Sequence, residues 1–174
     1  MSWPGYQTRG LTGKCTMETA YAPPSPWTNR WSEPSPQQLL NLLQEQHQTG
    51  FTTLIEKLDT DEHVRQSLVW YGQTWHWTIK YDLLNEAGNE LGILCYVVPN
   101  DTNPLVCITL ERSVIEALPT KRLGRFLNDG IRSAKCAITI HWAKWTPNTM
   151  TEVDLLLDLL KRKAKIVRAA AASA

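Results

Sequence analysis

Ser67-Leu-Val-Trp-Tyr-Gly-Gln-Thr-Trp-His-Trp-Thr-Ile-Lys-Tyr81 is the stretch from which the fold of this chain is best predicted. It contains three of the eight tryptophans. From Trp75 onward, large apolar residues alternate with smaller or polar ones, which is typical of a strand with one buried face. We expect a first strand here, entered through a tight turn at residues 71–73. The alternation assigns to its buried face Trp75, Trp77, Ile79 and Tyr81.

Three further strands are predicted downstream. Residues 85–89 have the composition of a hairpin loop, and the continuous apolar run that follows, 91–98, is typical of a central strand. A third strand is expected over 105–110, and the alternation over 136–142 predicts a fourth. Because consecutive strands with short links pair in antiparallel order, the sequence predicts a four-stranded antiparallel sheet.

Helices are predicted on both sides of these strands in the sequence. Ser35, Pro36 and Gln38 form a capping box that begins a helix ending near Thr49, with Gly50 as its C-terminal cap. A second helix is expected over about 52–58, and a helical crossover over 114–130, where Gly130 would stop the helix. A second capping box begins a long C-terminal helix at residue 149. The predicted class is α+β, with helices packed on one side of the sheet.

The first 35 residues are predicted to form an extended arm. Residues 1–36 hold six of the ten prolines, which disfavour helix and central strand alike. They also carry several aromatic residues, so we expect docking, with Trp27 and Trp31 as anchors. Docking on the same chain and docking on a second copy stay open, and so do a monomer and a homodimer. The globular domain would span 36–168, and the Ala-rich segment 169–174 would fray.

Composition limits the classes of function. The net charge is +1, so no overall field favours nucleic acid, and no apolar run approaches the roughly 20 residues that span a membrane. The N-terminus lacks the pattern of a signal peptide, so a cytoplasmic location is expected. No Cys-x-x-Cys pair is present, and we predict no metal site and no cofactor. Cys95, Cys107 and Cys136 are expected to be buried, and Cys15 is the candidate exposed thiol.

No catalytic motif is present, so the pattern favours a non-enzymatic binding module for a small molecule or partner peptide. Whether its aromatic residues form a pocket or only a core stays open. An enzyme using two histidines is one alternative, if the first and fourth strands are neighbours. Nucleic-acid or anionic-surface binding by the basic run 161–168 is another. The candidate ligand-binding residues are Trp70, Tyr71, Trp75, His76, Trp77, Tyr96 and His141.

A family resemblance rests on spaced aromatic residues. The patterns are Trp-Tyr-Gly-x-x-Trp-x-Trp over 70–77, Tyr81, Leu-Cys-Tyr-x-x-Pro over 94–99, and Glu-Val-Asp-Leu-Leu over 152–156 before Lys161. With these, residues 68–167 resemble a family of uncharacterised bacterial domains similar to the YdhG-like and MmcQ/YjbR-like group. The resemblance implies a small α+β domain with a curved antiparallel sheet and helices on one side. It implies no catalytic residues, and it leaves out the arm.

Overall fold

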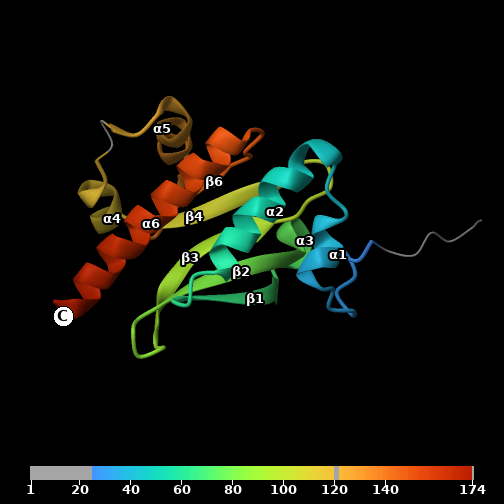
Figure 1. The fold of residues 1–174 in the computed structure, drawn as a ribbon, viewed down its shortest axis with the longest axis horizontal. Coiled ribbons are helices and arrows are strands. Elements are labelled where there is room, and N and C mark those ends of the chain that lie inside the picture. Colours follow the sequence, from blue (N-terminus) through green and yellow to red (C-terminus); the bar gives the residue numbers. More distant parts are fainter. Residues whose placement is uncertain (1–24, 120–121, 174) are drawn as a thin grey trace, which may run out of the picture.

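A six-stranded antiparallel sheet organises the part of the chain that the computed structural model describes, residues 25–119 and 122–173 (Figure 1). Its strand order is β1-β2-β3-β4-β6-β5. The strands are β1 (Val64–Trp70), β2 (Trp77–Leu84), β3 (Glu90–Val98), β4 (Leu105–Glu111), β5 (Lys135–Ala137) and β6 (Ile140–Trp145). The helices are α1 (Pro36–Leu40), α2 (Glu45–Asp59), α3 (Gly72–Trp75), α4 (Arg112–Ala117), α5 (Arg125–Arg132) and α6 (Met150–Ala172).

The two faces of the sheet differ in what covers them. Ile79 and Tyr81 of β2 point to the inner face, which α2 and α6 cover side by side (Figure 1). The Tyr81 hydroxyl donates to Asp59 of α2 at 3.1 Å, which ties the strand to that helix. Lys80 lies opposite Tyr96 of β3 in the register and therefore shares the outer face with it. The α+β class and the antiparallel sheet are confirmed.

Both predicted capping boxes are present. Ser35 accepts from the backbone N–H of Gln38 at the start of α1, and Thr149 does the same for Glu152 at the start of α6. The side chains of Gln38 and Glu152 in turn accept from the backbone N–H groups of Ser35 and Thr149. Two otherwise unpaired donors are therefore satisfied at the start of each helix. The helix α6 continues to Ala172, into the Ala-rich segment predicted to fray.

The prediction of four strands is wrong, because β1 and β5 were missed. In β1 the polar Gln66 occupies an inner-face position, which conceals the alternation expected of a strand. Its amide donates to Asp59 and to the Tyr81 hydroxyl, both at 2.9 Å, and these bonds account for a polar residue there. The predicted first strand is therefore β2, the second in the sheet, and it begins at Trp77 and not at Trp75.

The predicted strand over 136–142 is a hairpin. The chain turns at Ile138, which has φ of 60° and is fully exposed, so β5 and β6 pair with each other. Cys136 lies on the edge strand and is exposed, contrary to the prediction, because β5 has no strand on its other side. Cys95 and Cys107 are buried as predicted, and Cys15 lies outside the described residues.

Two glycines predicted to end helices lie inside them instead. The first helix stops at Leu40, and a second helix, α2, runs through Gly50. A Cβ atom at Gly50 would lie 3.3 Å from a methyl group of Val153 in α6. At Gly130 in α5 it would lie 2.1 Å from the Trp145 indole. Both glycines therefore allow a close approach of packed elements, which sequence alone does not distinguish from a cap.

Candidate functional site

The chain between β1 and β2 divides the aromatic residues into two groups. Gly72 has φ of 71° and His76 has φ of 46°, and between them α3 makes a single turn. The positive φ of His76 breaks the strand alternation between its neighbours, so Trp75 packs against Tyr96 of the outer face while Trp77 starts β2 on the inner face. The arm cluster consists of Trp27, Trp70, His76 and Trp77. The outer-face cluster consists of Tyr71, Trp75, Tyr96 and Trp142.

The arm cluster is closed by hydrogen bonds as well as by packing. The indole N–H of Trp27 donates to the Trp75 carbonyl at 3.2 Å, and that of Trp77 donates to the Asn29 carbonyl at 2.8 Å. The Trp27 ring meets His76 edge-on, with centroids 4.4 Å apart. These two bonds join the arm to the end of α3 and to the start of β2. The indole N–H groups of both rings therefore have acceptors within the protein.

The two predicted anchors of the arm behave differently. Trp27 is buried against its own chain, which confirms it as an anchor. Trp31 is 90% exposed, so its prediction as an anchor is wrong. The guanidinium of Arg30 lies 5.6 Å from the Trp31 ring and makes the cation–π contact that holds this side chain. The remainder of the predicted arm, residues 1–24, lies outside the described residues.

The outer-face cluster is built by ring contacts. Tyr96 and Trp142 stack with an interplanar angle of 11°, and Trp75 lies against both of them. The hydroxyls of Tyr71 and Tyr96 are 2.9 Å apart. Burial raises the pKa of Tyr96, and the hydrogen bond to Tyr71 raises this pKa further, so the hydroxyl stays neutral at ordinary pH.

A shallow hollow of about 340 Å³ opens over this cluster. Lys144 lies over the Trp75 ring at 5.1 Å, and neither it nor Lys135 is ion-paired among the described residues. Within the same part of the chain, the indole N–H groups of Trp75 and Trp142 make no hydrogen bond to the protein. The hollow is lined by Tyr71, Thr74, Trp75, Lys135, Trp142 and Lys144, with no carboxylate among them.

The structure divides the predicted ligand-binding residues. Tyr71 and Trp75 line the hollow and contact the buried Tyr96, whereas Trp70, His76 and Trp77 belong to the arm cluster. The residues that sequence reasoning missed are Thr74, Lys135, Trp142 and Lys144. The sequence does place Trp142 and Lys144 two residues apart, on one face of a strand. It does not reveal the register with β4 that brings this strand beside Tyr96.

The two predicted histidines do not share a site. His76 ends the α3 turn next to β2, and His141 lies on β6, with β3 and β4 between these two strands. Three strand spacings amount to about 14 Å. The two histidines could converge only if their strands were neighbours, and β2 and β6 are not. Among the described residues, no three His, Cys, Asp or Glu side chains are grouped as ligands for a metal ion.

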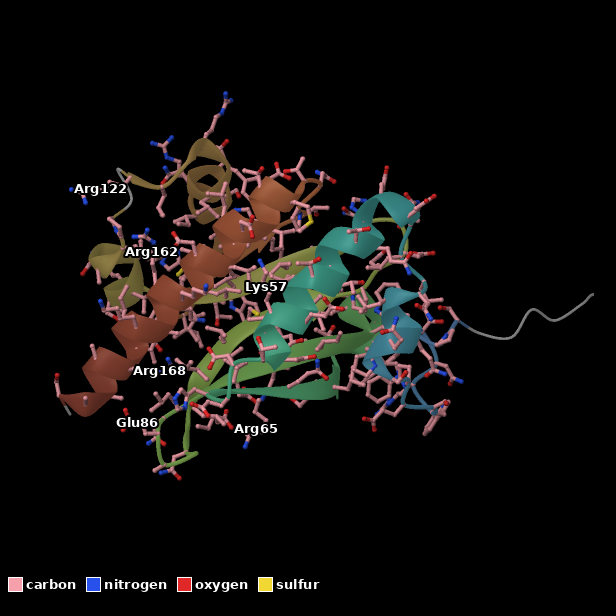
Figure 2. The ribbon with its side chains drawn as sticks, in the orientation of Figure 1. Lys57, Arg65, Glu86, Arg122, Arg162 and Arg168 are labelled. Carbon is pink, nitrogen blue, oxygen red and sulfur yellow. The ribbon has the colours of Figure 1, made fainter. Side chains whose placement is uncertain are left out.

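The basic run on α6 is not one continuous charged surface. Lys163 is buried, and the Arg162 guanidinium pairs with Asp158 at 2.7 Å. Arg162 and Arg168 are separated along the helix, and Lys57 bridges α2 and α6 through Asp154 (Figure 2). The nucleic-acid alternative therefore has fewer free cations than the sequence indicated. In the parts of the chain that the structure describes, no helix has the length and apolar character needed to span a membrane.

Comparison with known proteins returned no matching family model, no matching curated protein and no matching solved structure. The resemblance to the YdhG-like and MmcQ/YjbR-like group therefore stays a prediction, and the function is argued from the geometry of the hollow.

Proposed function

We propose that this protein is a binding module whose outer-face hollow takes a flat apolar group that carries a negative charge. The single observation that supports the proposal is the lining of the hollow. Among the described residues, the N–H groups of Trp75 and Trp142 bond no protein acceptor and the neighbouring Lys135 and Lys144 form no ion pair. No carboxylate stands among the residues that line the hollow. Buried indole N–H groups usually find a partner within the fold, as those of Trp27 and Trp77 do.

The shape of the hollow favours one flat group. The rings of Trp75 and Trp142 are 5.9 Å apart at an interplanar angle of 60°, so they form two walls of a corner. Aromatic rings prefer offset or edge-on contacts of this kind, each contributing about 0.5–1.5 kcal/mol beyond the area buried. The volume lies at the lower end of the range for small-molecule sites, which is enough for one or two fused rings.

The positive charges of the hollow favour flat ligands that carry a negative charge. Lys135 of the edge strand β5 and Lys144 of β6 both line the hollow, and the Lys144 ammonium lies over the Trp75 ring. A carboxylate or phosphate beside the ring would pair with them, and the Trp75 and Trp142 N–H groups offer further donors. An aromatic acid and an acidic peptide side chain next to an aromatic one both satisfy this chemistry.

Titration with three matched compounds tests the proposal. The probes are 1-naphthoate, which is flat and anionic, 1-naphthylmethylamine, which is flat and cationic, and cyclohexanecarboxylate, which is anionic and not flat. We expect 1-naphthoate to bind with a Kd of roughly 0.1–1 mM and the other two at least about fivefold more weakly. Calorimetry and amide chemical shifts of residues 71–75 and 142–144 are the measurements. Equal binding of all three compounds, or shifts elsewhere, would overturn the proposal.

Two variants locate the binding. Trp142→Leu should abolish measurable binding of 1-naphthoate because it removes one wall. Lys144→Gln should weaken binding about two- to fivefold, as expected for one exposed ion pair. Trp31→Ala and Lys161→Gln are matched controls, since they remove an exposed tryptophan and an exposed lysine outside the hollow. If the controls weaken binding as much as the hollow variants do, the site is elsewhere.

A further inference from the structure

Lys163 belongs to α6, and its buried amine reaches the backbone of β3 and the side chain of Thr109 in β4. Only 4% of the residue is exposed. Its Nζ donates to the carbonyls of Ile93 at 2.6 Å and Leu94 at 2.8 Å, and lies 3.2 Å from the Thr109 hydroxyl. Among the described residues, no carboxylate pairs with it. A lone buried charge is costly, so this position favours the neutral amine more than a surface site would.

The amine lies where two neighbouring strands separate. β3 and β4 pair only from Tyr96 to Val98 of β3, and a bulge between Ile93 and Cys95 directs the chain away from β4. A cleft of about 310 Å³ lies at the separation. The residues that line the cleft include Leu91, Thr109, Glu111, Val114, Trp142 and Lys163. We call it the strand-gap cleft. Most of its surface is apolar, and Lys163 is its single amine.

The hydrogen bonds around Lys163 fit a neutral amine as well as an ammonium ion. Two N–H groups suffice for the Ile93 and Leu94 carbonyls, and the nitrogen lone pair can accept from the Thr109 hydroxyl. The same hydroxyl has a second acceptor in the Ile93 carbonyl, at 3.4 Å. When Thr109 turns to that acceptor, the lone pair of Lys163 becomes free.

The surroundings of Lys163 also make the neutral form accessible. Burial lowers its pKa to about 8, and the negative forms of Cys95, Cys107 and Glu111 would oppose that change. Burial raises the pKa of both thiols to about 12, so they stay neutral near pH 8, and Glu111 is the one charged opponent among the groups that face the amine. At pH 7.5 such a lysine is roughly one quarter neutral, against about one part in a thousand for an ordinary lysine.

We propose that Lys163 condenses with an aldehyde or ketone of apolar body that enters the strand-gap cleft, and forms an imine. The neutral Nζ attacks the carbonyl carbon, the carbonyl oxygen gains a proton, and the nitrogen loses one, which gives a carbinolamine. The hydroxyl then gains a proton and leaves as water while the nitrogen gives up its remaining proton, which leaves the C=N bond. Glu111 and the Thr109 hydroxyl lie in the same cleft and can carry these protons. No oxidant or reductant is needed. The strand-gap cleft shares Trp142 with the outer-face hollow, but Lys163 lines only the cleft.

Reductive trapping on the full chain tests this inference. The protein is incubated with hexanal and sodium cyanoborohydride at pH 7.5, and peptide mapping follows the alkylation of each lysine. We expect Lys163 to be labelled at least about tenfold faster than the exposed Lys57 and Lys161, because far more of its amine is neutral. The preference should vanish in denaturing urea. Labelling of Lys163 at or below the rate of the exposed lysines in the folded protein would overturn the proposal.

Two comparisons establish the role of the cleft. Formaldehyde needs no apolar wall, so a preference for Lys163 that is as large with formaldehyde as with hexanal would contradict the apolar class of substrate. Leu91→Trp fills part of the cleft from β3 and should slow labelling of Lys163 by hexanal at least about fivefold, with Lys57 unchanged as the internal control. Unchanged labelling of Lys163 in a folded Leu91→Trp protein would show that the aldehyde does not enter there.

Discussion

The arm cluster and the outer-face cluster use the same kinds of residue in opposite ways. In the arm cluster, Trp27 and Trp77 donate their N–H groups to backbone carbonyls 48 residues away in the chain. In the outer-face cluster, rings pack on rings, and the Trp75 and Trp142 donors make no bond within the described residues. Trp70, the third tryptophan of the arm cluster, also makes no side-chain hydrogen bond within the described residues, so it is Trp27 and Trp77 that fasten the chain there. The donors of Trp75 and Trp142 remain available for the ligand that we propose.

The largest expected effect is on the arm cluster. Trp27→Ala removes a buried ring and one of the two hydrogen bonds to the Trp75 carbonyl, which keeps the bond from the Thr78 hydroxyl. We expect the free energy of unfolding to fall by about 3–5 kcal/mol, measured by urea denaturation. Trp31→Ala is the matched control and should change it by less than about 0.5 kcal/mol, because Trp31 is 90% exposed. Equal losses for the two variants would mean that the arm does not dock through Trp27.

Replacing each indole by a phenyl ring separates the clusters more finely. Trp77→Phe keeps most of the ring but deletes the bond to the Asn29 carbonyl, so unfolding should become easier by about 1–3 kcal/mol. Trp142→Phe deletes a donor that has no protein acceptor among the described residues, and should cost less than about 1 kcal/mol.

The same pair of variants should reverse its order when ligand binding is measured. Trp142→Phe should weaken binding of 1-naphthoate, whereas Trp77→Phe should leave the Kd unchanged in the folded protein. If Trp142→Phe proves the more destabilising change and leaves binding intact, Trp142 is a core residue and the distinction between the clusters is wrong.

The sequence predicted these regions unequally, for physical reasons. Capping boxes are local, because donor and acceptor lie three residues apart, and both were found. Residues 75–81 were predicted as one strand because large residues alternate there, but the positive φ of His76 places Trp75 and Trp77 on different faces. Positive φ at a histidine is uncommon, and nothing in the local pattern indicates it.

Only some of the residues that line the hollow were predicted from the sequence. Tyr71 and Trp75, which line it, and the buried Tyr96, which packs against both, were predicted from their density in one stretch and the strand that follows. Trp142 and Lys144 come from a strand that is distant in sequence and reaches them only through β4. Which strand neighbours β4 is decided by the helical crossover and the β5–β6 hairpin, and these depend on packing throughout the domain, which a linear pattern does not encode.

The smallest expected effect concerns the Tyr71–Tyr96 hydroxyl pair within the outer-face cluster. Tyr71→Phe removes the partner of a buried hydroxyl, so unfolding should become easier by about 0.5–1.5 kcal/mol at pH 7. The pKa of Tyr96 is raised first by burial and then by this bond, so in the variant it should fall but stay above its ordinary value.

The consequence for stability has a definite sign. Above pH 10 the unfolded chain loses the Tyr96 proton while the folded chain keeps it, so stability falls as the pH rises. In Tyr71→Phe the part of this decline that is due to Tyr96 should end at a lower pH and be smaller in total, because the folded and unfolded pKa values of Tyr96 lie closer together. NMR of protein labelled at tyrosine Cζ measures the ionisation of Tyr96 directly, apart from that of Tyr81, whose pKa burial also raises. An unchanged Tyr96 titration in the variant would show that the hydroxyls do not bond. Ring contacts alone would then hold the outer-face cluster, and Tyr71 would be free to move when a ligand enters the hollow.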